Sequence, residues 1–66
     1  MPLLRVELWP GRSPESKRKL VGELTDVIVR NIGCPREAVT ILLTEVPKEH
    51  WVIGGIPCSE SRKDVP

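Results

Sequence analysis

The sequence predicts an α/β protein made of a single β-α-β unit, with a short extended segment near its C-terminus. Three observations support this fold: apolar residues alternate over residues 3–8, recur at helical spacing over residues 20–32, and fill residues 39–46. Because the connections between these segments are short, we expect a right-handed crossover joining two parallel strands. One helix covers one face of a two-stranded sheet, which leaves the other face and both edges open.

The first strand is predicted at residues 3–8, where apolar and polar side chains alternate with a period of two. One face is expected to carry Leu4, Val6 and Leu8, and the other Leu3, Arg5 and Glu7. The strand should end at Trp9, because Pro10 offers no N–H to a neighbouring strand and Gly11 tolerates unusual dihedral angles.

The helix is predicted to begin at Ser13, which can cap free N–H groups, with Pro14 at the first helical position. Its apolar stripe consists of Leu20, Leu24, Val27 and Ile28, flanked by Val21 and Ile32. Gly22 lies in mid-helix, where glycine costs about 1 kcal/mol against alanine, so we expect it to mark a close packing contact. Gly33 and Pro35 should end the helix.

The second strand is predicted at residues 39–46, and both of its faces are largely apolar. Residues 47–50 form a turn, residues 51–53 form a short extended piece, and the Gly54-Gly55 pair closes it. Residues 56–66 are expected to be a flexible tail. Residues 1–66 together make one domain.

Self-association is the first functional inference, because the chain is too small for a stable core. Ordering 66 residues costs roughly 100 kcal/mol of conformational entropy. A chain with no Phe and no Tyr can hardly offset that cost alone. A symmetric oligomer that packs the open faces and edges of the sheets is the expected solution.

Composition excludes several classes of protein. Ten Lys and Arg residues oppose nine Asp and Glu residues, so nucleic-acid binding is not expected. No apolar run is long enough to span a membrane, and the first residues do not form a signal peptide, so we expect a cytoplasmic protein. Cys34 and Cys58 have no metal-binding spacing with His50, and we expect both to be ordinary small residues.

Pro2 is the candidate catalytic residue. A small second residue permits removal of Met1, which would leave proline with a free secondary amine. A free α-amino group has a pKa of about 7.7–8, and apolar burial beside an arginine would lower that pKa. A base with a pKa near neutrality suits the abstraction of a proton next to a carbonyl. Arg12 and Trp51 are the candidate substrate-binding residues, since a guanidinium binds carboxylates and an aromatic wall lowers the local dielectric.

These residues resemble the 4-oxalocrotonate tautomerase family. The matching features are Pro2, the GRSPE stretch at residues 11–15, LLTEVPKEHW at residues 42–51 and IGG at residues 53–55. The resemblance implies short β-α-β chains assembled as hexamers (trimers of dimers), and isomerases associated with the catabolism of aromatic compounds.

In such an enzyme the amino-terminal proline moves a proton between an enol oxygen and a carbon of an unsaturated 2-oxo acid. The resemblance implies that Pro2 is this acid and base, that Arg12 binds a substrate carboxylate, and that Trp51 lines an apolar wall. It also implies that no metal or cofactor takes part.

The chain departs from the family pattern at Thr40, where studied tautomerases carry a second arginine that polarises the 2-oxo group. Losing such a contact could cost on the order of 2–4 kcal/mol in the transition state. Three explanations are open. Arg36 or Arg5 could supply the missing charge from another direction. The reaction could instead be hydration or dehalogenation of an unsaturated acid. Or a different chain in a heterohexamer supplies the arginine, and Thr40 itself can still donate a hydrogen bond to the substrate.

Two alternatives to the tautomerase hypothesis follow. A hydratase or dehalogenase would need a water-activating carboxylate, and the sequence offers no firm candidate. A non-catalytic companion subunit would never expose its proline. If the mature chain keeps Met1, Pro2 is an amide nitrogen and cannot act as a base.

Overall fold

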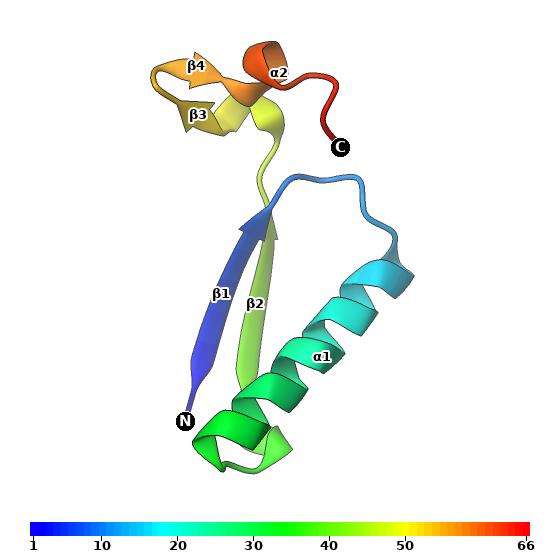
Figure 1. Cartoon of the computed structure of the whole chain (residues 1–66), viewed down its shortest axis with the longest axis vertical. Helices are drawn as coiled ribbons and strands as arrows, with labels where there is room; N and C mark the ends of the chain where they lie inside the picture. Colours follow the sequence, from blue (N-terminus) through cyan, green and yellow to red (C-terminus); the bar gives the residue numbers. More distant parts are fainter.

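A computed structural model describes residues 1–66 and shows the predicted β-α-β arrangement (Figure 1). The elements, in chain order, are β1 (Leu3–Leu8), α1 (Pro14–Ile32), the 3-10 turn η1 (Arg36–Ala38), β2 (Thr40–Glu45), the 3-10 turn η2 (Lys48–His50), β3 (Val52–Ile53), β4 (Ile56–Pro57) and α2 (Cys58–Ser61). β1 and β2 form a parallel pair, and β3 and β4 form a separate antiparallel hairpin. None of the helices has the run of apolar residues that a bilayer crossing requires.

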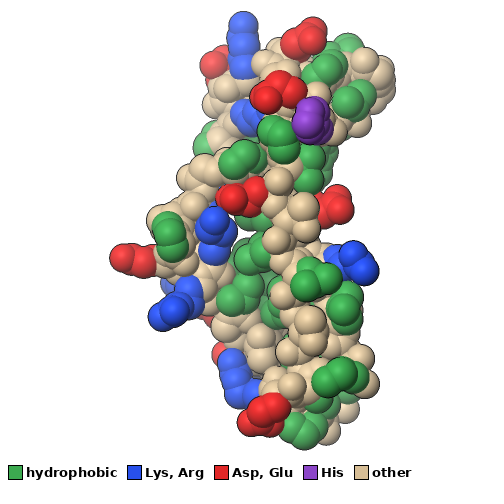
Figure 2. Space-filling model, turned by 180° about the vertical axis from the view of Figure 1, so that it is seen from behind, with side chains coloured by type: hydrophobic (Ala, Val, Ile, Leu, Met, Phe, Trp, Pro, Cys, Tyr) green, Lys and Arg blue, Asp and Glu red, His purple; other side chains and the backbone are tan.

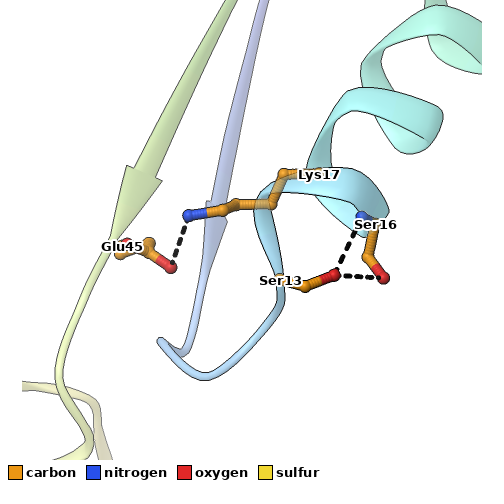
Figure 3. Close-up of polar contacts among 4 residues, drawn as sticks. All are labelled: Ser13, Ser16, Lys17 and Glu45. Carbon is orange, nitrogen blue, oxygen red and sulfur yellow. Dashed lines mark hydrogen bonds and ion pairs between the residues drawn. The ribbon is translucent and has the colours of Figure 1, made fainter.

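α1 begins and ends where the sequence predicts. The Ser13 hydroxyl accepts a hydrogen bond from the Ser16 N–H at 3.1 Å, and Pro14 occupies the first helical position (Figure 3). At the other end, Gly33 adopts a left-handed conformation with φ of 75°, and its N–H donates to the Val29 oxygen at 2.9 Å. These caps satisfy backbone groups that the helix itself leaves unpaired.

One ion pair connects the first turn of α1 to the end of β2. The Lys17 ammonium lies 3.2 Å from a Glu45 carboxylate oxygen (Figure 3). Both side chains remain partly exposed, so the pair contributes at most about 1 kcal/mol.

The two faces of the β1–β2 sheet differ as predicted. Leu4 pairs with Ile41 and Val6 with Leu43, and all four are half-buried. The opposite face, here called the open face, carries the pairs Leu3–Thr40, Arg5–Leu42 and Glu7–Thr44. Leu3 and Leu42 on this face are 53% and 42% exposed, so two apolar side chains of the sheet are left uncovered in the single chain.

Two details of the helix and the second strand differ from expectation. β2 is shorter than the predicted range 39–46, because Val39 still donates to the Arg36 oxygen and thereby closes η1. Gly22 makes no close contact within the chain: a Cβ added there would meet nothing within 4 Å. The expectation of a tight approach at Gly22 is therefore wrong for the single chain.

The expectation of a flexible tail from residue 56 is corrected for its first half. Ile56–Pro57 pairs with β3, and Cys58–Ser61 forms a helical turn. Gly54 and Gly55, with φ of 59° and 82°, allow the tight hairpin turn. Cys58 is fully buried, and its N–H donates to the Trp51 oxygen at 2.8 Å. This small side chain anchors the segment, which polar composition alone did not predict.

The single chain lacks a compact core. Cys58 is the one fully buried residue among 66. The radius of gyration is 14.8 Å, against about 11 Å for a compact domain of this length. The accessible surface is 5031 Å², whereas a compact monomer of this mass exposes roughly 4,200 Å². Seen from behind, apolar side chains appear along the whole length of the molecule (Figure 2). The excess surface is close to what one partner buries in a standard interface, about 800 Å².

Candidate active site

Pro2 and Thr40 lie together at the amino ends of the two strands. The Thr40 N–H donates to the Pro2 oxygen at 3.0 Å, which fixes Pro2 beside the start of β2. Pro2 is half-buried, while Met1 is 96% exposed and packs against nothing. We call Pro2 and Thr40 the proline half-site.

Trp51 lies at the opposite end of the sheet, beside Trp9, the residue that follows β1. The Trp9 and Trp51 rings meet edge to face, with centroids 5.8 Å apart and planes inclined at 77°. The Lys48 ammonium lies over the Trp9 ring, 4.6 Å from its centroid. Such a contact is worth about 0.5–1 kcal/mol at an exposed site. The two rings form an apolar surface, and the Lys48 cation lies over one of them.

Arg12 lies on the loop between β1 and α1, at the same end of the molecule. Its guanidinium donates to the main-chain oxygen of Pro66 at 3.1 Å. Lys48 donates to the main-chain oxygen of Arg62 at 2.6 Å and to that of Val65. The C-terminal residues therefore fold back over this end of the chain (Figure 1). We call Trp9, Arg12, Lys48 and Trp51 the arginine half-site.

One chain does not bring the two half-sites together. Pro2 precedes β1 and Arg12 follows it, and β1 is six residues long, which corresponds to about 20 Å. The single chain also holds no pocket. The predicted residues Pro2, Arg12, Trp51 and Thr40 thus fall into two groups at opposite ends of the molecule.

The structure distinguishes between the two arginines that could supply the charge missing at Thr40. Arg36 forms an ion pair with Asp26 on α1, which engages its guanidinium. Arg5 makes no ion pair or side-chain hydrogen bond, and the strand register places it on the open face with Thr40. Arg5 is therefore the freer of the two cations.

Lys48 has no role in the sequence analysis, and Trp9 is considered there only as the end of the first strand. Both reach the arginine half-site through tertiary contacts, so no local pattern reveals them. The Trp9 indole N–H is covered and has no hydrogen-bond acceptor. His50 is exposed in η2, as expected of a turn residue (Figure 2). No three His, Cys, Asp or Glu side chains converge on a point that could hold a metal ion.

A small β-α-β chain, with a proline at the start of its first strand and an arginine after it, belongs to a recognisable class of enzyme subunit. Residues 2–60 match the profile of the family described as Tautomerase enzyme, and the match begins at Pro2 itself. The chain belongs to this tautomerase family and is an isomerase of the 4-oxalocrotonate tautomerase type.

Curated relatives align over nearly the whole chain. A probable tautomerase of Ralstonia nicotianae is 43% identical over 63 residues, which covers 96% of this chain and 90% of the relative. A 2-hydroxymuconate tautomerase of Pseudomonas putida is 38% identical over 60 residues, covering 91% of this chain and 95% of the relative.

Solved structures share the same fold. A 4-oxalocrotonate tautomerase homologue of the tomaymycin biosynthetic pathway superposes with a TM-score of 0.89 at 38% identity, covering 98% of this chain and all of the other. A heterohexamer 4-oxalocrotonate tautomerase from Chloroflexus aurantiacus gives a TM-score of 0.85 at 37% identity, with coverage of 91% and 97%.

Proposed function

We propose that this tautomerase interconverts enol and keto forms of unsaturated 2-oxo acids, with Pro2 as the acid and base. The observation that carries the proposal is the family match over residues 2–60, a range that includes Pro2, Arg12 and Trp51. One of the aligned relatives is a 2-hydroxymuconate tautomerase, which makes 2-hydroxymuconate the first substrate to test. A cytoplasmic location and a role in aromatic catabolism remain part of the same proposal.

In the proposed reaction, the Pro2 nitrogen takes the proton from the enol oxygen and returns it to a carbon of the conjugated chain. This chemistry requires the removal of Met1, because an amide nitrogen has no basic lone pair. The exposure of Met1 leaves it accessible for removal. Arg12 binds a substrate carboxylate through its planar fork, and Trp51 excludes water from the reacting atoms.

The complete site is proposed to form between copies of the chain. The half-sites lie at opposite ends of one chain, so an antiparallel neighbour would bring its arginine half-site to the proline half-site of the first copy. The uncovered open face supplies apolar surface for the assembly, which we propose is a hexamer built as a trimer of dimers. Since an aligned relative is a heterohexamer, a partner chain that supplies the charge absent at Thr40 is the alternative to a homohexamer.

The direct test replaces the base. Pro2→Ala should lower the turnover of 2-hydroxymuconate at least about a hundredfold, while native mass spectrometry shows the same oligomer as the parent. Pro10→Ala is the matched control, since Pro10 is exposed in the loop after β1, and should retain turnover. A mature chain that keeps Met1, or a Pro2→Ala variant as active as the parent, would contradict the proposal.

A second test asks whether the site is shared between copies. Pro2→Ala and Arg12→Ala chains should each be inactive alone. When the two are co-expressed at equal levels, about a quarter of sites in mixed oligomers pair an intact Pro2 with an intact Arg12. Recovery of activity near that fraction supports a shared site, and no recovery in oligomers shown by mass to be mixed refutes it.

A further inference from the structure

Lys48 makes more contacts than its position in the turn η2 requires. Its ammonium group binds the main-chain oxygens of Arg62 and Val65 and lies over the Trp9 ring. Arg12 binds the oxygen of the next residue, Pro66. Two cations therefore hold three main-chain oxygens of one short segment, residues 62–66.

Arg12 and Lys48 hold the oxygens of two consecutive residues, so the two cations lie close to each other. Val65 and Pro66 are neighbours in the chain, so the nitrogens that hold their oxygens lie within about 12 Å of each other. Two cations within this distance can each bind one of two anionic groups that are joined by a short chain. The Trp9–Trp51 pair supplies an apolar surface at the same end of the molecule.

We propose that Lys48 determines substrate specificity by forming, with Arg12, a two-cation receptor for a dicarboxylate, which residues 62–66 occupy in the free chain. The assignment of Arg12 to substrate carboxylate rests on the proposed function. Lys48 adds a second charge at the arginine half-site of a chain that has Thr40 in place of the family's second arginine. The Arg62 and Val65 oxygens that Lys48 holds are neutral peptide carbonyls. Carboxylates form stronger, charge-assisted hydrogen bonds, so a dicarboxylate should displace the tail from Lys48.

The test measures binding rather than turnover. The two tryptophans of the chain, Trp9 and Trp51, both lie at the receptor, so intrinsic fluorescence reports its occupancy. The probes are adipate, a six-carbon dicarboxylate, and hexanoate, a monocarboxylate of equal length. The Met1-processed protein should bind adipate at least about tenfold more tightly than hexanoate, as expected for one additional charge-assisted contact.

Three variants locate the effect. Lys48→Met should abolish the preference for adipate and leave the dissociation constant for hexanoate within about twofold of the parent. Lys48→Arg, which keeps the charge, should restore most of the preference. Lys19→Met removes the same charge from an exposed position on α1 and should behave as the parent. If Lys48→Met weakens both ligands equally, Lys48 has a structural role and the proposal is overturned.

A chain that ends at Ser61 tests whether residues 62–66 occupy the receptor. Without residues 62–66 the receptor is open, so adipate should bind severalfold more tightly than to the full chain. An unchanged affinity, or no binding of either probe to both chains, overturns the proposal. Because neither probe reacts, these outcomes are independent of Pro2, whose role is tested separately by the turnover of Pro2→Ala and by the removal of Met1.

Discussion

Leu42→Lys should dissociate the proposed oligomer, because Leu42 lies at the centre of the open face. It pairs with Arg5 across the sheet and is 42% exposed in the single chain. Burying the rest of a leucine side chain contributes about 1 kcal/mol. A lysine there loses this term and adds the cost of burying an ammonium group beside Arg5, which is several kcal/mol. Each copy should thus lose at least about 3 kcal/mol of association free energy, a factor of a hundred or more in the dissociation constant.

Analytical ultracentrifugation over a range of concentrations measures this loss, and turnover should fall in parallel because the half-sites separate. Val27→Lys is the matched control. Val27 is 43% exposed, almost the same as Leu42, but lies on α1 and not on the sheet. If Leu42→Lys leaves the oligomer intact, or if Val27→Lys dissociates it equally, the open face is not the interface.

Three further predictions concern stability, each measured by thermal denaturation monitored by circular dichroism. Ser13→Ala removes the N-cap of α1 and should cost about 1 kcal/mol, whereas an unchanged melting temperature would show that the cap contributes nothing. Gly22→Ala should stabilise the helix by about 1 kcal/mol, since a methyl group there meets open space. Gly55→Ala should instead destabilise the fold, because the hairpin turn holds Gly55 at φ of 82°. Equal effects of the two substitutions would contradict this contrast. Trp9→Phe removes an unpaired buried N–H and should be close to neutral, and a loss above about 2 kcal/mol would reveal a missing acceptor.

The β-α-β unit was predictable because its signals are local. Alternation over β1, the Ser13 cap and the Gly33 stop each depend on a few neighbouring residues, and the structure confirms all three. The C-terminal hairpin was predicted poorly. A Gly-Gly pair between short apolar segments does indicate a hairpin, but the polar residues beyond it obscured the burial of Cys58.

The candidate site was predictable in its residue types and not in its arrangement. Pro2, Arg12 and Trp51 stand out by their chemistry and by the family resemblance. Their division between two ends follows from the direction of β1 and the parallel register of Leu3 with Thr40. The contacts of Lys48 with the C-terminal residues are long-range, so no sequence period indicates them.

The division of the site between the ends of one chain has a consequence for regulation by protein level. In the proposed shared site a monomer would have no complete centre, so the specific rate per chain should fall steeply once dilution passes the dissociation constant. A change in protein concentration through synthesis or degradation would then change the total activity more than proportionally. A newly synthesised chain would be inactive until it assembled with other copies.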